Sequence, residues 1–157
     1  MKKDIIICDL DGTLCNIDHR LHFVQVAQGE RKDWNSFFSG APNDTINEPV
    51  LEVLDRFRFA SDEFEIIFCS GRPERCRADT VEWLKKNYFI ERRGHLHYKL
   101  YMRKDGDYRR DDIVKEEILN EHIDRNRVLF VLDDRDQVVD MWRRNGLTCF
   151  QVAEGNF

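Results

Sequence analysis

Short apolar runs alternate with helix-like segments along most of this chain, and this alternation constrains the fold more than any other feature. Runs that are short and rich in β-branched and aromatic residues predict strands at 4–8, 64–69, 96–102, 128–132 and 148–152. Between them, helices are predicted at 49–59, 73–87, 112–122 and 136–145. Such alternation predicts an α/β fold of three layers, with a mostly parallel sheet and helices on both faces.

Local signals agree with the helix boundaries, and one segment breaks the pattern. Pro49 and Pro73 suit first-turn positions, and Gly146 suits a helix C-terminal cap. The segment at about 15–48 instead combines aromatic residues with turn-forming residues at 40–44. We expect it to be a small, mainly helical cap inserted into a single domain that spans 1–157.

The composition limits the class of protein and its surroundings. A chain of 157 residues with 41% hydrophobic residues suits one soluble domain with a core. No apolar run is long enough for a bilayer, and we expect no membrane contact. Five cysteines, an odd number without a C-x-x-C pair, favour free thiols in the cytoplasm. A net charge of −5 argues against a broad groove that binds many phosphates.

Two carboxylates follow the first predicted strand, in the sequence Asp9-Leu10-Asp11-Gly12-Thr13. Residues two apart in a strand share a face, so both acids leave the sheet on the same side. Crowded carboxylates repel unless a cation or a shared proton intervenes, and Mg²⁺ prefers such oxygen ligands. An ionised aspartate can also attack phosphorus. The alternative is a strand that ends in an acidic turn.

Polar residues also follow two further predicted strands. Ser70-Gly71-Arg72 offers a hydroxyl, a close backbone approach and a fork of donors for a phosphate, although Ser70 could simply cap a helix. Asp133 and Asp134 end the strand at 128–132; one suits a direct Mg²⁺ ligand and the other a supporting role. The alternative for this pair is an acidic helix N-terminus.

A lysine and an aspartate complete the set of candidate residues. Asp111 and Lys115 lie four apart in a predicted helix, so the carboxylate can aim the ammonium group. The spacing alone equally fits an ordinary surface ion pair, which contributes little to stability.

The order Asp-x-Asp-Gly-Thr, Ser, Lys, Asp-Asp resembles the haloacid dehalogenase (HAD) superfamily of phosphohydrolases. This resemblance implies a HAD-like Rossmannoid fold, Mg²⁺ as cofactor and an aspartyl-phosphate intermediate. It assigns catalysis to Asp9, Asp11 and Lys115, with Asp9 as nucleophile and Asp11 as general acid and base. It assigns metal binding to Asp9, the Asp11 backbone carbonyl and Asp134, and orienting roles to Asp111 and Asp133. Substrate phosphate would be held by Thr13, Arg20, Ser70, Gly71 and Arg72.

Residues 105–157 resemble one particular group within this superfamily. The stretches at 111–118, 133–146 and 149–157, together with Ile46-Asn47-x-Pro49, are similar to the 3′-phosphatase domain of phage polynucleotide kinase–phosphatases. In that family an arginine after the first motif and the arginine of Ser-Gly-Arg help hold phosphate, which points to Arg20 and Arg72. No G-x-x-x-x-G-K-[ST] loop is present, so nothing in this chain could act as the kinase. The resemblance also implies a separate kinase or ligase as a partner.

We therefore expect a phosphomonoesterase that removes 3′-phosphates from nucleic acid ends or from 3′-nucleotides. Because Asp11 must hold a proton in the first step, a raised pKa is expected for it. One alternative is a small-molecule phosphatase such as a 5′-nucleotidase. A second alternative, a response-regulator-like phospho-acceptor domain, would not be an enzyme. The oligomeric state and the choice between DNA and RNA stay open. Basic residues near the active edge could hold the adjacent nucleic-acid backbone, although for most of them a solvated charged surface is the favoured interpretation: Arg75, Arg77, Arg103, Lys104, Arg109 and Arg110.

Overall fold

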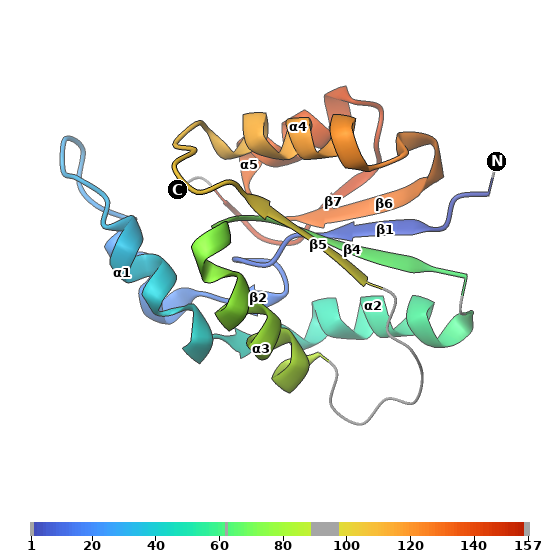
Figure 1. The fold of residues 1–157 in the computed structure, drawn as a ribbon, viewed down its shortest axis with the longest axis horizontal. Coiled ribbons are helices and arrows are strands. Elements are labelled where there is room, and N and C mark those ends of the chain that lie inside the picture. Colours follow the sequence, from blue (N-terminus) through green and yellow to red (C-terminus); the bar gives the residue numbers. More distant parts are fainter. Residues whose placement is uncertain (1, 62, 89–97, 156–157) are drawn as a thin grey trace.

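A five-stranded parallel sheet forms the centre of the protein (Figure 1). The structure is a computed structural model and describes residues 2–61, 63–88 and 98–155. In spatial order the strands are β5 (Tyr98–Arg103), β4 (Glu65–Pro73), β1 (Ile5–Cys8), β6 (Val128–Asp133) and β7 (Cys149–Gln151). Strand β1 lies at the middle of the sheet, so its carboxyl end is flanked by the ends of β4 and β6.

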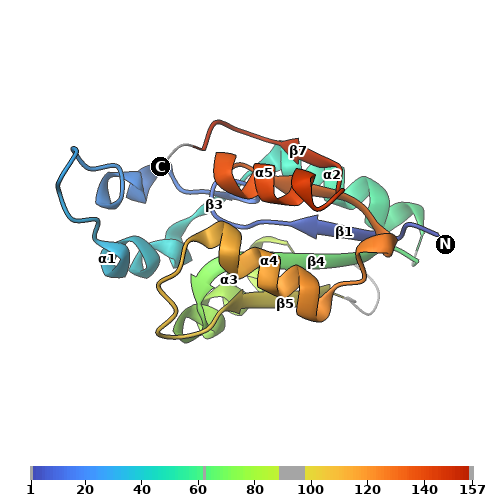
Figure 2. The same cartoon turned by 90° about the horizontal axis from the view of Figure 1, so that it is seen from above.

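Helices cover both faces of the sheet, as Figures 1 and 2 show. One face packs against α2 (Glu48–Ala60) and α3 (Arg77–Asn87), and the other against α4 (Asp111–His122) and α5 (Asp136–Arg144). The predicted three-layer α/β fold is confirmed. No helix among the described residues is both long enough and apolar enough to cross a membrane.

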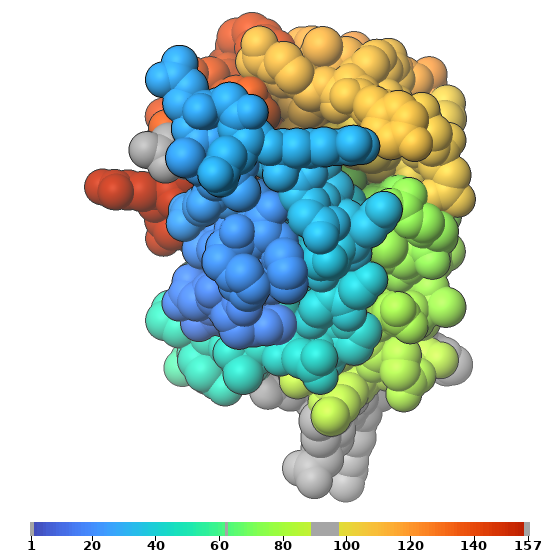
Figure 3. All heavy atoms as spheres, turned by 90° about the vertical axis from the view of Figure 1, so that its left-hand side faces the viewer, coloured from blue at the N-terminus to red at the C-terminus, as the bar shows by residue number. Residues whose placement is uncertain are grey.

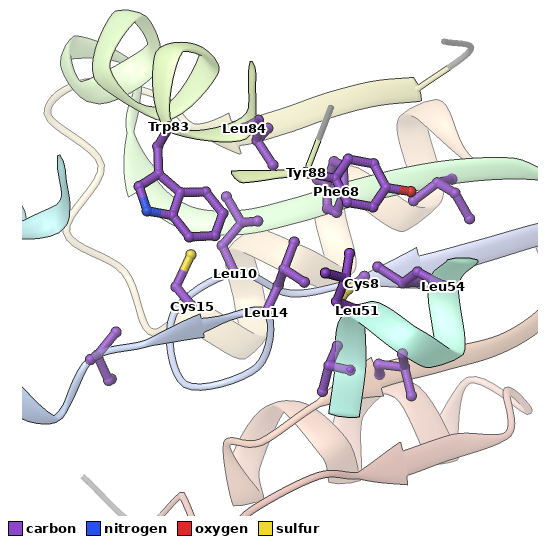
Figure 4. Packing of buried hydrophobic residues seen from close by; sticks show 14 of the residues in the cluster. Cys8, Leu10, Leu14, Cys15, Leu51, Leu54, Phe68, Trp83, Leu84 and Tyr88 are labelled. Atoms are coloured by element: carbon purple, nitrogen blue, oxygen red, sulfur yellow. The ribbon is translucent and has the colours of Figure 1, made fainter. Parts of the chain in front are cut away.

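The core divides into two halves because strand side chains alternate between faces. In β1, Ile6 and Cys8 point toward α2 and α3, whereas Ile5 and Ile7 point toward α4 and α5. The first half extends to the turn after β1, where Trp83 of α3 lies over the residues of that turn (Figure 4). This packing fixes the turn that carries the first acid pair. All five cysteines are free thiols, and four of them are buried.

The start of α3 differs from the prediction. The predicted helix at 73–87 is wrong in its first turn, because β4 continues to Pro73 and a short 3₁₀ helix, η3 (Glu74–Cys76), precedes α3. Pro73 has extended backbone angles and pairs with Arg103, so it ends a strand. The predicted strand at 96–102 is seen from Tyr98 onward; residues 96 and 97 lie outside the described residues.

Between β1 and α2 the chain forms a small layer at the carboxyl end of the sheet (Figures 1 and 3). Its ends pair as the antiparallel strands β2 (Cys15–Asn16) and β3 (Thr45–Ile46). Between them lie η1 (Asp18–Phe23), α1 (Trp34–Ser39) and η2 (Ala41–Asn43). We call residues 15–46 the cap segment.

Candidate active site

The polar residues predicted from the sequence meet where the central strands end. Asp9 follows β1 directly, Ser70 lies in β4, and Asp133 ends β6. All three are buried, and the Asp9 amide donates to the Leu132 carbonyl at 3.0 Å. Because the carboxyl ends of parallel strands share one edge, residues far apart in sequence form one site there.

Lys115 links the acids of two strands. Its ammonium group donates to Asp9 Oδ1 at 2.7 Å and to Asp133 Oδ2 at 2.9 Å, and its side chain is 1% exposed. Burial alone would lower the pKa of Lys115, but the charges of Asp133 and Asp9 raise it well above the usual value. The alternative of an exposed surface ion pair is therefore wrong, and Lys115 is a buried ammonium ion.

Asp111 and Asp133 contact this lysine unequally. The Asp111 carboxylate is 3.8 Å from the Lys115 nitrogen, which is too long for a hydrogen bond. Asp133 accepts from Lys115, from the indole of Trp142 at 3.0 Å, and from the backbone amides of Asp134 and Arg135. Of the two predicted orienting residues, Asp133 is thus the one that holds the ammonium group in place.

Trp142 was not among the candidates from the sequence. The only signal was that a buried indole needs an acceptor for its N–H group.

Three carboxylates form a cluster, and Lys115 contacts two of them. Ligand atoms of Asp9, Asp133 and Asp134 lie within 4.8 Å of one another, and Lys115 supplies a single positive charge. Burial, with the neighbouring carboxylates, raises the pKa of Asp9, and that of Asp134 to about 7. An excess of two negative charges on clustered oxygens fits a divalent cation with oxygen ligands, so the residues present suit Mg²⁺.

The turn after β1 brings its residues close to Asp134. Gly12 has φ of +84°, and a Cβ there would lie 2.2 Å from Asp134 Oδ2. Thr13 is buried and donates to Asp9 Oδ2 at 3.2 Å and to Asp134 Oδ1 at 3.4 Å. Thr13 therefore steadies the acids in this structure, and its role as a phosphate ligand stays a prediction.

Asp11 is the clearest departure from expectation. Burial would raise its pKa, but Arg72 and Arg20 outweigh that effect and lower the pKa of Asp11 to about 2. Both arginines donate to Asp11 Oδ1, Arg20 at 2.6 Å and Arg72 at 2.5 and 2.9 Å. The expected raised pKa is wrong for this arrangement, because two buried guanidinium groups stabilise the ionised carboxylate.

A second buried acid, Asp44, holds the same two arginines. Arg20 donates to both of its oxygens at 2.7 and 2.6 Å, and Arg72 donates to one at 3.0 Å. The side chains of Arg20 and Asp44 are 0% exposed. Sequence reasoning placed Asp44 only in a turn and missed it, because no local pattern marks an acid that pairs with distant arginines.

The predicted phosphate-binding residues differ in whether they line the central cavity. Gly71 lines the central cavity, and a Cβ there would lie 2.2 Å from Asp111 Oδ1. Ser70 is buried and accepts from the Arg72 amide at 3.2 Å, so it lies within β4 and caps no helix. Arg20, Ser70 and Arg72 are not among the residues that line the cavity, and phosphate binding by them stays a prediction.

The cavity above the acids has a volume of about 920 Å³. Its base contains Asp9, Asp11, Lys115, Asp133 and Asp134. Residues of the cap segment around α1 and of the connection between β5 and α4 form its walls. Figures 1 and 2 show that both segments lie at the carboxyl end of the sheet. The space exceeds that needed for a phosphate group, so it can also admit part of a larger leaving group.

The basic residues proposed to contact the nucleic-acid backbone differ in how many of their side chains already pair within the protein. Arg77 pairs with Glu74, Arg109 with Asp107 and Glu117, and Arg110 with Asp112. Arg103 donates to the Gly71 carbonyl and to the backbone around Tyr108. Lys104 is exposed and lies 3.6 Å from Glu117, and Arg75 is exposed and donates to Asn35. Several of these side chains therefore brace the protein itself.

Comparison with known proteins places this chain in a family. The model of the family described as "Polynucleotide kinase PNKP phosphatase domain" matches residues 3–157. A chain of the solved Pnkp1/Rnl/Hen1 RNA repair complex is 38% identical, with a TM-score of 0.77 over 99% of this chain and 44% of that one.

Two further relatives are more distant. A protein of Autographa californica nuclear polyhedrosis virus, described as a bifunctional polynucleotide kinase/RNA ligase, is 29% identical over 88% of this chain and 17% of its own length. The class C acid phosphatase of Bacillus anthracis shares the fold, with a TM-score of 0.53 at 17% identity over 85% of this chain and 53% of that one. The present chain thus spans less than half the length of its relatives from the repair complex and the virus.

The match of the family model covers nearly the whole chain, and it includes every strand end that contributes to the acid site. This chain therefore belongs to the family of polynucleotide kinase PNKP phosphatase domains, within the HAD superfamily.

Proposed function

We propose that this protein is a Mg²⁺-dependent polynucleotide 3′-phosphatase that acts through an aspartyl-phosphate. The observation that carries the proposal is the contact of Lys115 with both Asp9 and Asp133 at the base of an open cavity, in a chain of this family. A buried lysine beside a carboxylate at a cavity base suits the binding of a phosphoryl group and its attack by that carboxylate.

In the proposed first step, a carboxylate oxygen of Asp9 attacks phosphorus and the 3′-oxygen leaves. Lys115 remains an ammonium ion and stabilises charge on the phosphoryl oxygens. Asp9, Asp134 and the Asp11 carbonyl would hold Mg²⁺, which supplies positive charge to the same oxygens when bound. Water then cleaves the aspartyl-phosphate, releasing phosphate and restoring Asp9.

Asp11 is proposed to protonate the leaving oxygen and later to accept a proton from water. Its pairing with Arg20 and Arg72 keeps it ionised in the present arrangement, so the proposal requires it to turn away from them and take up a proton. The side chain is 16% exposed and lines the cavity, which leaves room for that rotation.

The substrate is proposed from the relatives. The solved complex is described as an RNA repair complex, and the viral protein as a polynucleotide kinase/RNA ligase. Such activities act on nucleic acid ends. On this basis we propose 3′-phosphorylated ends as substrate, and a kinase or ligase as partner. A cytoplasmic location, suggested by the cysteine content, belongs to the same proposal.

One experiment separates this activity from the alternatives. Purified protein is assayed with Mg²⁺ on a 3′-phosphorylated oligonucleotide, a nucleoside 3′-monophosphate and a nucleoside 5′-monophosphate. We expect hydrolysis of the 3′-phosphates, complete loss in EDTA, and loss of at least a thousandfold in Asp9→Asn, by analogy with the removal of other nucleophiles. Asp18→Asn, an exposed acid of η1, is the matched control.

Other outcomes point elsewhere. Preference for the 5′-monophosphate would replace the proposal by a nucleotidase, and turnover by Asp9→Asn would exclude the mechanism. Absence of hydrolysis of any substrate, including p-nitrophenyl phosphate, would favour a phospho-acceptor domain. The two-step role of Asp11 predicts that Asp11→Asn accumulates phosphoenzyme from p-nitrophenyl phosphate, whose leaving group needs no proton.

A further inference from the structure

Two aromatic side chains lie in the walls of the cavity that holds the acids at its base. Trp34 begins α1 in the cap segment, and Tyr108 lies in the connection between β5 and α4. Trp34 is 37% exposed and Tyr108 is 92% exposed. Large exposed rings beside a reactive centre, rather than scattered over the surface, indicate a surface for a planar apolar ligand.

Trp34 is positioned by its neighbours although one part of it is open. Its ring meets Phe37 edge-on at 5.7 Å and lies nearly parallel to Phe38 at 5.8 Å between ring centres. The Asp33 side chain caps this helix by accepting from the Ser36 amide at 3.0 Å. A ring that is already fixed loses little conformational entropy when a ligand stacks on it.

The backbone around Tyr108 is also fixed. Arg103 donates to the Asp107 carbonyl at 3.1 Å and to the Arg109 carbonyl at 2.6 Å, on either side of Tyr108. Arg109 in turn pairs with Asp107 and Glu117. The protein thus braces this connection with several charged groups and leaves the aromatic side chain almost fully in water, where it has no packing role.

Positive charge accompanies the rings. Arg31, Lys32 and Arg75 line the same cavity, and none has a carboxylate within ion-pair distance in the part of the chain that the structure describes. The Lys32 ammonium lies 5.6 Å from the Trp34 ring centre, and Arg75 donates to Asn35 on the same wall. Planar rings beside unpaired cations suit a ligand that alternates nucleobases with phosphates.

We infer that Trp34 and Tyr108 are substrate-binding residues that stack unpaired nucleobases next to the 3′-phosphate, so that the site prefers a single-stranded end to a mononucleotide. This inference rests on the proposed function and adds the form of the substrate and two residues that read it. Bases within a duplex are stacked on one another and present no free face, which is why the strand must be unpaired there.

The test measures kcat/KM on 3′-phosphorylated deoxyoligonucleotides of increasing length, from the mononucleotide to a hexamer, and on glycerol 2-phosphate as a substrate without a ring. For the wild type, kcat/KM should rise over the first added nucleotides. Trp34→Ala and Tyr108→Ala should each lower it about 5- to 100-fold on the hexamer, as expected for one lost stacking contact. Turnover of glycerol 2-phosphate, whose leaving group has no ring to stack, should change less than twofold in both variants.

Matched variants make the result specific. Trp34→Phe and Tyr108→Phe keep a ring and should restore most of the hexamer activity, whereas Phe59→Ala removes a ring that is 63% exposed away from the cavity and should have no effect. Equal losses on glycerol 2-phosphate and the hexamer would show that these residues only support the fold, and would overturn the inference.

Failure of the inference is distinguishable from failure of the proposed function. A wild type that hydrolyses all 3′-phosphorylated lengths with equal kcat/KM, with unchanged hexamer activity in both alanine variants, overturns the base-stacking role alone. A wild type that hydrolyses p-nitrophenyl phosphate but none of the 3′-phosphorylated substrates overturns both.

Discussion

Asp44 shows how a single buried residue can support an active site without lining it. Its carboxylate accepts from Arg20 and Arg72, and both arginines also hold Asp11, which does line the cavity. Two arginines between two carboxylates balance in charge, so the group can remain buried. Removal of one acid leaves buried positive charge without compensation.

We predict that Asp44→Asn lowers the free energy of unfolding by about 3–5 kcal/mol, the cost of breaking a buried ion pair. Urea denaturation followed by circular dichroism measures this value. Asp18→Asn, which removes an exposed acid of the same cap segment, should change it by less than about 0.5 kcal/mol. If Asp44→Asn unfolds at the same urea concentration as the wild type, the four side chains do not act as a charge-balanced unit.

At the scale of elements, the site is assembled by the turn after β1 and by two helices on one face. Helix α4 carries Lys115, and α5 carries Trp142, so the packing of these helices brings both donors to Asp133 at the end of β6. The turn brings Gly12 against Asp134, at a spacing that admits no Cβ atom. The packing of these elements therefore fixes the distances between the acids, which the sequences of the elements alone do not determine.

Alanine variants of two glycines with similar backbone angles can distinguish the effect of backbone strain from that of a steric collision. Gly12→Ala and Gly146→Ala both place a Cβ at positive φ, +84° and +79°, which costs roughly 1–2 kcal/mol. Only the alanine at 12 would collide with Asp134, since a Cβ at 146 meets nothing within 4 Å. We predict that both variants lose stability, Gly12→Ala more than Gly146→Ala because of the added collision, and that only Gly12→Ala loses turnover on p-nitrophenyl phosphate.

Thermal unfolding and the p-nitrophenyl phosphate assay on the same preparations check this pair. Equal activity in the two variants would mean that Asp134 moves aside without consequence, and that its position is not critical.

For the whole molecule, the acid cluster contributes part of the net charge of −5 and concentrates that part at one buried place. Burial of Asp9, Asp133 and Asp134 beside the one ammonium of Lys115 opposes folding through mutual repulsion. A divalent cation that binds only the folded state removes this repulsion and stabilises the protein through mass action.

We predict that saturating Mg²⁺ raises the Tm by about 5–10 °C, which corresponds to roughly 2–3 kcal/mol at a hundredfold excess over the Kd. Differential scanning fluorimetry with EDTA and with NaCl of matched ionic strength measures the effect. In Asp134→Asn the shift should largely disappear, while the metal-free Tm should equal or exceed that of the wild type. A full shift in Asp134→Asn would place the cation elsewhere.

Much of this protein was determined by its sequence alone. The alternation of strands and helices follows from local periodicity, and the ends of the three central apolar runs were identifiable because Asp9, Ser70 and Asp133 interrupt them. The order of the motifs then predicted the family and the site from Asp9 to Asp134. The error at Pro73 arose because a strand residue and a first-turn helix residue share the same local signal.

The tertiary structure decided which carboxylates of the site are protonated and which are ionised. Whether a carboxylate is protonated depends on its burial and on the charges around it, and those come from residues that are distant in sequence. Sequence reasoning expected a raised pKa at Asp11 and had no signal for Asp44 or Trp142, whereas the fold places two arginines on Asp11 and gathers the excess negative charge at Asp9 and Asp134. Local pattern thus determined which groups are present, and packing determined which of them pair.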